Sequence, residues 1–183
     1  TPALQRESAR GGVSPQIETP VLWRYDANPL LGWNPIPSAA RIFNSAVISR
    51  DGAFAGVFRA DHKNGRPQLH RGFSADGLSW EIDDAVLPWV DRDGKPCPTS
   101  YAYDPRLVEL EGRTYVVWCD DFRGDCSQKS VGPSIGLGVT DDFETFVRLE
   151  RPLMPFNRNG VLFPRKIGGE YVLLSRPSDG GHT

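Results

Sequence analysis

The sequence predicts an all-β protein. Its 183 residues include 19 glycines and 16 prolines, which fall between short runs of β-branched and aromatic residues, as in proteins whose strands are joined by many turns. No stretch keeps apolar residues at helical spacing over three turns, so we expect little helix. Residues 1–40 are rich in Pro, Ser, Asn and Gly and are predicted to form an N-terminal arm with loops, whereas residues 41–183 carry the strand pattern.

An internal repeat organises these strands. Residues 46–61 and 106–121 align at an offset of 60, which places Asp51-Gly52 on Glu111-Gly112. Each segment consists of a strand-like run, an acidic residue followed by Gly, and a second strand-like run. This order is typical of a β-hairpin.

A second hairpin is predicted after each of the first two. Its markers recur 66 residues apart, with Gly72, Ser74, Asp76 and Trp80 matched by Gly138, Thr140, Asp142 and Phe146. A third copy of the first hairpin begins at Val161, with Gly168-Gly169 as its turn. Four strands per unit predict the blades of a β-propeller, with a β-sandwich as the alternative. Closed propellers use about 4–8 blades, so about three units predict an incomplete ring.

Composition excludes several classes of function. A formal net charge of −2 argues against binding nucleic acid or an anionic membrane through bulk charge. No apolar run approaches the roughly 20 residues that a membrane-spanning helix needs. The three cysteines, Cys97, Cys119 and Cys126, form no Cys-x-x-Cys pair and predict free thiols in a reducing cytoplasm. The three histidines lack metal-ligand spacing, so no metal site is predicted.

Asp104 is the first candidate for chemistry. It lies in the segment Tyr101–Arg106, at the entry to the second unit and just ahead of a predicted strand. If the repeat forms blades, this position is at the inner end of a blade, where propellers bind ligands. The alternative is structural, because Asp-Pro commonly starts a turn and Arg106 could simply pair with a carboxylate.

Arginines near strand ends are the second candidate. Arg158 lies in the segment Pro155–Gly160, whose Asn-Gly pair is also typical of a turn. Arg176 follows an apolar strand of the third unit, and Arg59 ends the equivalent strand of the first. Guanidinium groups hold phosphate or carboxylate in a bidentate way, so these residues could bind an anion or could form internal salt bridges.

Six longer motifs occur in order along the chain: Ile42–Ala46, Gly56–Arg59, Tyr103–Arg106, Pro155–Lys166, Ser175–Asp179 and Gly181–Thr183. Together they resemble the motifs of glycoside hydrolase family 130, the β-mannoside phosphorylases and related mannosidases. The resemblance covers roughly residues 28–183 and is most specific in the Asn-Arg-Asn-Gly block.

The resemblance implies a five-bladed β-propeller with its active site in the central channel. It implies that Asp104 is the catalytic acid. It further implies three phosphate-binding residues and five residues that contact sugar. Among the five, His182 is the one implied to lie near the acceptor sugar. The phosphate set is Arg158, Asn159 and Arg176, and the sugar set is Asn44, Ser45, Arg59, Tyr103 and His182.

The implied chemistry agrees with the residue types. An inverting glycosidase that uses water needs two carboxylates, whereas phosphate is already an anionic nucleophile. Phosphate carries roughly 1.5 to 2 negative charges near neutral pH and therefore needs cations such as Arg158 and Arg176. We expect inverting phosphorolysis of β-mannosides to α-mannose 1-phosphate, with inorganic phosphate as co-substrate and no cofactor. A β-mannoside hydrolase and an inactive carbohydrate-binding fragment are the alternatives, and direct and relayed proton transfer both remain open.

Two departures from the family accompany this resemblance. The family chain continues well beyond the length of this one, so the sequence represents a fragment, or other copies in a homo-oligomer supply the missing blades. The polar segment Arg123–Ser130 looks like an insertion and is predicted to be a surface loop. This loop is a candidate for an oligomer contact.

Overall fold

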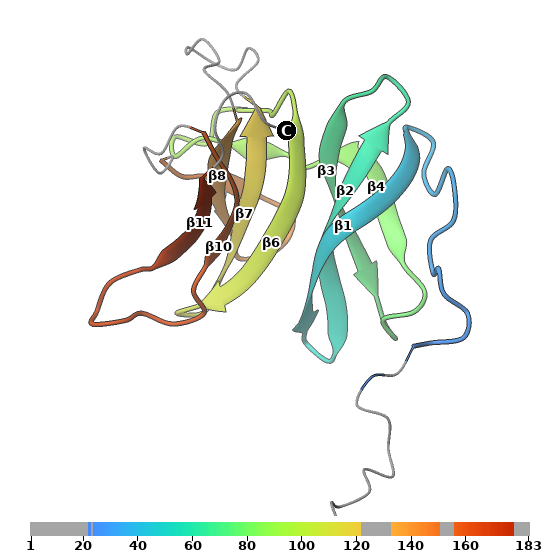
Figure 1. Ribbon diagram of the computed structural model, residues 1–183, viewed down its shortest axis with the longest axis horizontal. Coiled ribbons are helices and arrows are strands. Elements are labelled where there is room, and N and C mark those ends of the chain that lie inside the picture. The colour runs from blue at the N-terminus through green and yellow to red at the C-terminus, as the bar shows by residue number, and fades with distance from the viewer. Residues whose placement is uncertain (1–21, 23, 122–132, 151–155, 178–183) are drawn as a thin grey trace, which may run out of the picture.

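The structure, a computed structural model, describes residues 22, 24–121, 133–150 and 156–177, and within these ranges its regular elements are β-strands in three sheets (Figure 1). The first sheet, blade 1, has the strand order β1-β2-β3-β4 with antiparallel neighbours. Its strands are β1 (Ala39–Arg50), β2 (Ala53–His62), β3 (Pro67–Ser74) and β4 (Glu81–Val86).

The second sheet, blade 2, repeats this order and adds one strand. From the inside outward it runs β6-β7-β8-β9, and β5 pairs in parallel with β9 at the outer edge. Its strands are β5 (Trp89–Val90), β6 (Ala102–Leu110), β7 (Arg113–Asp121), β8 (Pro133–Thr140) and β9 (Phe146–Arg148). The two predicted four-stranded units are therefore confirmed, whereas β5 had no counterpart in the repeat.

The third sheet, blade 3, is a single antiparallel hairpin of β10 (Asn157–Leu162) and β11 (Leu173–Pro177). The predicted start at Val161 was wrong, because β10 begins four residues earlier and includes the Asn-Arg-Asn-Gly block. In Figure 1 the three sheets stand side by side with β1, β6 and β10 toward the interior. The arrangement is that of neighbouring blades in an open part of a propeller.

The hairpin turns follow from their sequences. Asp51 and Gly52 have φ of 50° and 79°, and Glu111 and Gly112 have φ of 54° and 75°. Two successive residues with positive φ are typical of the turns whose twist matches that of two paired strands. The predicted hairpins at both positions are confirmed by the strand pairing.

The core lies between the sheets and depends on the two-residue alternation of β7. Val116 and Trp118 face blade 1, where they join a cluster of buried residues that includes Val57. Val117 faces the opposite way and packs with Leu162 of blade 3. Because successive side chains point to opposite faces of a strand, β7 is buried on both sides and fixes the relative positions of the three sheets.

Candidate active site

The inner strands of all three blades carry the same irregularity. One residue in each has a positive φ, namely Asn44 in β1 (47°), Asp104 in β6 (51°) and Asn159 in β10 (55°). Strand pairing shifts at each of these residues, as it does at a β-bulge. Asn and Asp adopt this left-handed conformation more readily than most residues. The three bulges therefore turn three polar side chains out of the regular alternation of their strands.

These three side chains meet at the carboxyl group of Asp104. Its Oδ1 accepts hydrogen bonds from Nη1 of Arg59 at 2.7 Å and from Nδ2 of Asn44 at 3.1 Å. Its Oδ2 accepts one from Nδ2 of Asn159 at 3.3 Å. Asp104 itself is only 7% exposed, so one buried carboxyl group of blade 2 is bound by donors from the blades on either side of it.

The surroundings of Asp104 favour its ionised form. Burial raises the pKa of this carboxyl group, but the hydrogen bonds from Arg59 and Asn44 and the charges of Arg59 and Arg106 outweigh burial. The net result is a pKa below the ordinary value of an aspartate. In this arrangement the group is a carboxylate at neutral pH.

Arg59 is held in place from several sides. Its guanidinium carbon lies 4.2 Å from the ring centroid of Phe43 and 5.3 Å from that of Tyr103. Its Nε donates to Oδ1 of Asp61 at 3.0 Å, and the other oxygen of Asp61 accepts from Nε and Nη2 of Arg41 at 3.1 and 3.0 Å. The two rings and two carboxylates leave Arg59 little freedom, which suits a group that must bind a ligand in one orientation.

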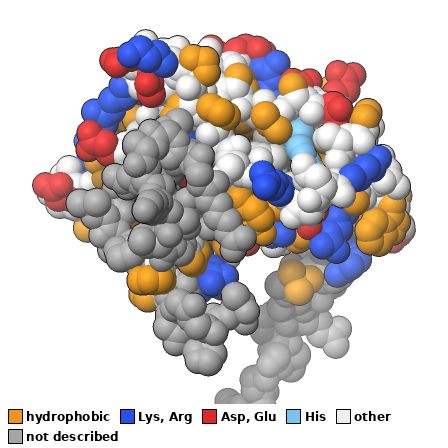
Figure 2. Space-filling model, turned by 90° about the horizontal axis from the view of Figure 1, so that it is seen from above, with side chains coloured by type: hydrophobic (Ala, Val, Ile, Leu, Met, Phe, Trp, Pro, Cys, Tyr) orange, Lys and Arg blue, Asp and Glu red, His pale blue; other side chains and the backbone are white. Residues whose placement is uncertain are grey.

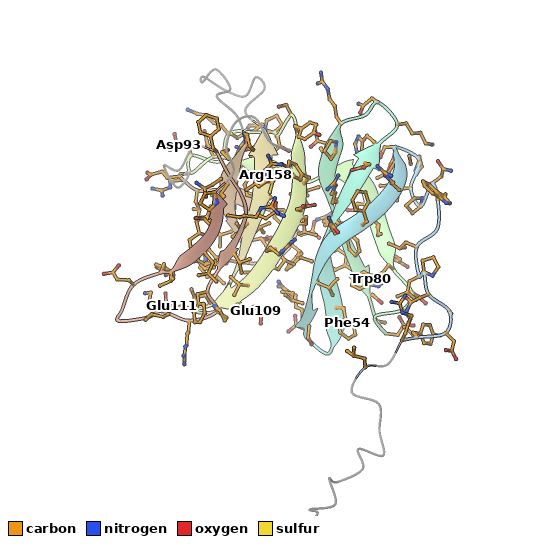
Figure 3. The ribbon with its side chains drawn as sticks, viewed as in Figure 1. Phe54, Trp80, Asp93, Glu109, Glu111 and Arg158 are labelled. Atoms are coloured by element: carbon orange, nitrogen blue, oxygen red, sulfur yellow. The ribbon has the colours of Figure 1, made fainter. Side chains whose placement is uncertain are left out.

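Tyr103 connects this cluster to blade 3. Burial raises the pKa of its hydroxyl to about 12, with a further contribution from Cys119, while the positive charge of Arg158 acts in the opposite direction. Arg158 is therefore near enough to Tyr103 to influence its ionisation. Figure 3 shows Arg158 in the upper half of the molecule, at the end opposite to Glu109 and Glu111.

Arg158 and Arg176 are direct partners across the β10–β11 pair. Residues paired in this way project from the same face of a sheet, and like charges so placed repel each other. Arg176 is exposed and Arg158 is half-buried. Two guanidinium groups on one face make a site that an anion would stabilise by relieving this repulsion.

Of the remaining predicted residues, the structure describes Ser45 and does not describe His182. The hydroxyl of Ser45, beside Asn44 in the β1 bulge, donates to the backbone oxygen of Phe43 at 3.4 Å. His182 lies outside the described residues, as does the predicted surface loop Arg123–Ser130.

Two local sequence interpretations need correction. Asp104 was predicted just ahead of a strand, but it lies inside β6, because the bulge lets the strand continue past it. The Asn159-Gly160 pair was open to interpretation as a turn, but both residues belong to β10, and Asn159 uses its positive φ in a bulge instead.

Sequence reasoning missed three residues that contact the cluster: Phe43, Asp61 and Cys119. A signal for Cys119 was present, because the offset of 60 that aligns the first two units places Cys119 on Arg59. The same offset places Phe43 on Tyr103, so a signal for Phe43 was present as well.

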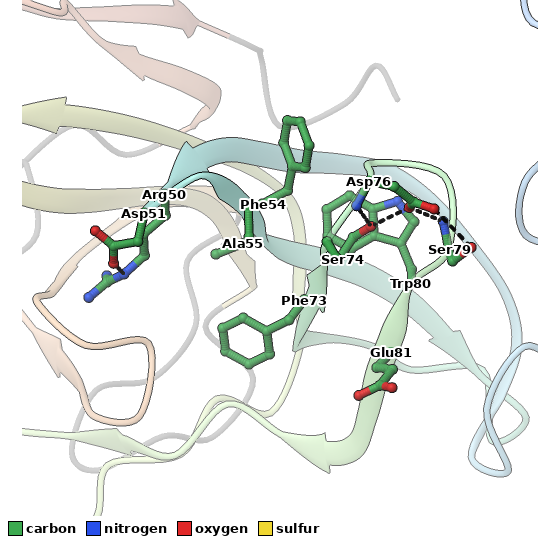
Figure 4. A pocket seen from close by; sticks show the side chains of 12 residues that line it. Arg50, Asp51, Phe54, Ala55, Phe73, Ser74, Asp76, Ser79, Trp80 and Glu81 are labelled. Carbon is green, nitrogen blue, oxygen red and sulfur yellow. Dashed lines mark hydrogen bonds and ion pairs between the residues drawn. The ribbon is translucent and has the colours of Figure 1, made fainter.

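A separate pocket of about 570 Å³ lies at the other end of blade 1 (Figure 4). Its walls include Phe54, Phe73 and Trp80, and Figure 3 shows Phe54 and Trp80 at the end of the molecule away from Arg158. Asp76 also lines it, but Oδ1 of this residue accepts hydrogen bonds from the backbone of Leu78 and Ser79 and closes the β3–β4 turn. None of the predicted site residues that the structure describes lines this pocket.

Figure 2, seen from above, displays acidic, basic and apolar side chains interspersed among the described residues. In the described part of the chain, no group of three or more His, Cys, Asp and Glu side chains is placed to hold a metal ion. The same part contains no helix long and apolar enough to cross a membrane.

Fold and site together define a β-propeller in which neighbouring blades direct polar side chains at one buried carboxyl group. Comparison with known proteins identifies its family. A family model described as beta-1,4-mannooligosaccharide phosphorylase matches residues 6–183. The chain therefore belongs to glycoside hydrolase family 130, as its motifs predicted.

Curated relatives agree with this assignment. The chain is 47% identical over 169 residues to a beta-1,4-mannooligosaccharide phosphorylase of Ruminococcus albus, covering 89% of this chain and 48% of the relative. It is 29% identical to a 4-O-beta-D-mannosyl-D-glucose phosphorylase of Bacteroides fragilis, covering 88% of this chain and 43% of the relative. The chain thus spans about half the length of the curated relatives it matches.

Solved structures show the same fold. A beta-1,2-mannobiose phosphorylase from Listeria innocua superposes with a TM-score of 0.64 at 18% identity, covering 88% of this chain and 60% of that one. A putative glycoside hydrolase from Bacteroides ovatus gives a TM-score of 0.62 at 17% identity, covering 85% of this chain and 53% of that one. The sheets described here are accordingly part of a five-bladed β-propeller, and the predicted fold is confirmed.

Proposed function

We propose that this chain carries part of the active site of a phosphorylase acting on β-1,4-linked mannooligosaccharides. The observation that carries the proposal is the buried carboxyl group of Asp104 on the second blade, bound by donors from the first and third blades, with two paired arginines on the third blade. The family model and the 47% identical relative support the β-1,4 linkage. In the proposed reaction, the bond between mannose C1 and the acceptor oxygen breaks, and a phosphate oxygen bonds to C1 from the opposite face. The products are α-mannose 1-phosphate and the shortened acceptor, whose oxygen takes up the proton.

Each side chain has a role in this proposal. Asp104 supplies the proton, directly or through a hydroxyl of the sugar. Asn44, Ser45, Arg59 and Tyr103 contact the mannose that is transferred, and His182 lies near the acceptor. Phosphate is held by the remaining set, which comprises Arg158, Asn159 and Arg176.

Phosphorolysis fits the charges of the site better than hydrolysis does. An inverting hydrolase needs a second carboxylate to activate water. The other carboxylate connected to this cluster, Asp61, already accepts hydrogen bonds from Arg41 and Arg59. The arginine pair on β10 and β11 instead suits an anionic nucleophile.

Incubation with β-1,4-mannobiose in the presence and absence of inorganic phosphate tests this proposal. We expect mannose 1-phosphate to form only with phosphate, and cleavage to be slower by orders of magnitude without it. Equal release of free mannose under both conditions would show a hydrolase. Calorimetric binding of mannobiose without any turnover would show a carbohydrate-binding fragment.

The hydrogen bonds of Asp104 also predict how its proton affinity changes during the reaction. A catalytic acid must be protonated, yet Arg59 and Asn44 lower the pKa of Asp104 in the free protein. Both donors are proposed to contact mannose, so a bound sugar draws their hydrogen bonds away from Oδ1 and removes two of the effects that lower the pKa of Asp104, which raises that pKa. The decline of activity with rising pH should therefore occur at a higher pH for kcat than for kcat/KM.

This prediction is checked by pH profiles at saturating and at limiting mannobiose, with phosphate saturating in both. A control substrate, p-nitrophenyl β-mannoside, has a leaving group that needs no proton. The pH difference between its kcat profile and its kcat/KM profile should therefore be smaller than the difference for mannobiose. If kcat and kcat/KM for mannobiose decline at the same pH, the proposed rise in the pKa of Asp104 on sugar binding is contradicted.

Four further expectations belong to this proposal. A cytoplasmic location is supported by the free thiols of Cys97 and Cys119. A homo-oligomer remains a prediction, as does the division of the chain into an arm over residues 1–40 and blades over residues 41–183. Phosphate is proposed as co-substrate, without a cofactor.

A further inference from the structure

Cys119, near the end of β7, uses its thiol to hold a residue of the neighbouring blade. The residue is fully buried, and its Sγ lies 2.9 Å from Oδ1 of Asn159 and 2.8 Å from the backbone nitrogen of Asn159. The thiol thus donates to the side-chain oxygen of Asn159 and accepts from its backbone N–H. With its oxygen turned toward Cys119, the amide of Asn159 directs Nδ2 at Oδ2 of Asp104.

The same relation occurs between the first two blades. Arg59, on the second strand of blade 1, donates to Asp104, the bulge residue of blade 2. Cys119, on the second strand of blade 2, donates to Asn159, the bulge residue of blade 3. In blade 1, Arg59 is the strand partner of the residue just before the bulge in β1. In blade 2, Cys119 is the strand partner of the residue just before the bulge in β6. Arg59 and Cys119 therefore occupy equivalent positions in their blades. Cys119 therefore occupies a position that the fold uses to orient the next blade's bulge side chain.

We propose that Cys119 is a positioning residue for the reaction, which orients the Asn159 amide so that Nδ2 faces the carboxyl group of Asp104. The proposal rests on the proposed function for its kinetic consequences only, because the orientation itself is a property of the chain without ligand.

The ionisation of Cys119 is consistent with this role. Burial raises the pKa of the thiol to about 11, and the negative charge of Asp104 acts in the same direction. The backbone N–H of Asn159, the hydroxyl of Tyr103 and the charge of Arg106 act in the opposite direction without offsetting burial. The thiol therefore keeps its hydrogen at neutral pH and remains a donor to Oδ1.

Three single variants of the protein at its natural length separate positioning from packing. Cys119→Ser retains a donor and an acceptor, Cys119→Ala retains neither, and Val117→Ala removes buried volume from the same face of β7. We expect Cys119→Ala to lower kcat by about tenfold to a hundredfold, as the loss of one oriented hydrogen bond does. Cys119→Ser should stay within about threefold of wild type, and Val117→Ala should lower the unfolding midpoint while leaving kcat near wild type.

A double-mutant cycle with Asn159→Ala tests whether Cys119 acts through Asn159. When Asn159 is already truncated, Cys119→Ala should change kcat by less than about twofold. A further loss equal to that of the single variant would overturn the proposal. So would a loss of kcat in Val117→Ala as large as that in Cys119→Ala.

A measurement without substrate keeps this inference separate from the proposed function. The side-chain NH₂ signal of Asn159, assigned by its disappearance in Asn159→Ala, should shift with the titration of Asp104 in wild type and in Cys119→Ser. That shift should be lost in Cys119→Ala. If it is lost as expected but wild type shows no phosphorolysis, the proposed function fails and the positioning role stands. If it persists in Cys119→Ala, the positioning role fails, whatever the activity.

Discussion

Replacing Asp104 with Asn should reduce phosphorolysis of mannobiose by at least about a hundredfold to ten-thousandfold, the range that a general acid contributes. The substitution keeps the size of the side chain and removes the proton that it can give. Asn also tolerates the positive φ of 51° at this position, so the β6 bulge should form as before. Arg59 keeps its hydrogen bond to Asp61 and so retains one carboxylate partner. The loss of activity should therefore appear in a folded protein.

Initial rates with mannobiose and a thermal unfolding curve together check this result. Asp141→Asn is the matched control, because Asp141 forms an exposed ion pair with Arg113 on blade 2 and contacts none of the proposed site residues. The control should keep wild-type kcat. Near-normal turnover in Asp104→Asn, or a loss shared equally by Asp141→Asn, would remove Asp104 from the catalytic role.

The parts of this fold that were predictable from sequence are those encoded by neighbouring residues. Asp51-Gly52 and Glu111-Gly112 fix their own turns through backbone conformations that Gly readily adopts, and the adjoining runs of β-branched and aromatic residues determine the strands. Strand β5 was not predictable from sequence, because a strand of two residues is too short to show an alternating pattern. In addition, its Trp89 pairs with a strand that comes more than fifty residues later.

The candidate site illustrates a different limit of prediction from sequence. Motif resemblance indicated Asn44, Asp104 and Asn159, but not that all three occupy equivalent bulges. A bulge is a property of the pairing between two strands, so a single strand's sequence does not specify it. Contacts such as that from Cys119 to Asn159 depend on how adjacent blades pack, which explains why the sequence predicted only a free thiol at this position.

Replacing Arg176 with Ala should raise the KM for phosphate by about tenfold to a hundredfold, because hydrogen bonds to charged groups contribute about 1.5–3 kcal/mol. The KM for mannobiose should change little. Arg176 is exposed and lies directly opposite Arg158, so its removal also relieves a repulsion in the ligand-free protein. We therefore expect the unfolding midpoint of Arg176→Ala to equal or exceed that of wild type in phosphate-free buffer.

This combination, weaker use of phosphate with undiminished stability, distinguishes an anion site from a structural salt bridge. Loss of a structural ion pair would lower stability and leave the KM for phosphate unchanged. Arg165→Ala is the matched control, since Arg165 is an exposed arginine of the same blade whose guanidinium lies over the ring of Phe163. Steady-state kinetics with varied phosphate, alongside unfolding curves with and without phosphate, decide between the two roles. Added phosphate should stabilise wild type and Arg165→Ala more than Arg176→Ala, because at a given concentration a ligand stabilises the folded state more when it binds that state more tightly.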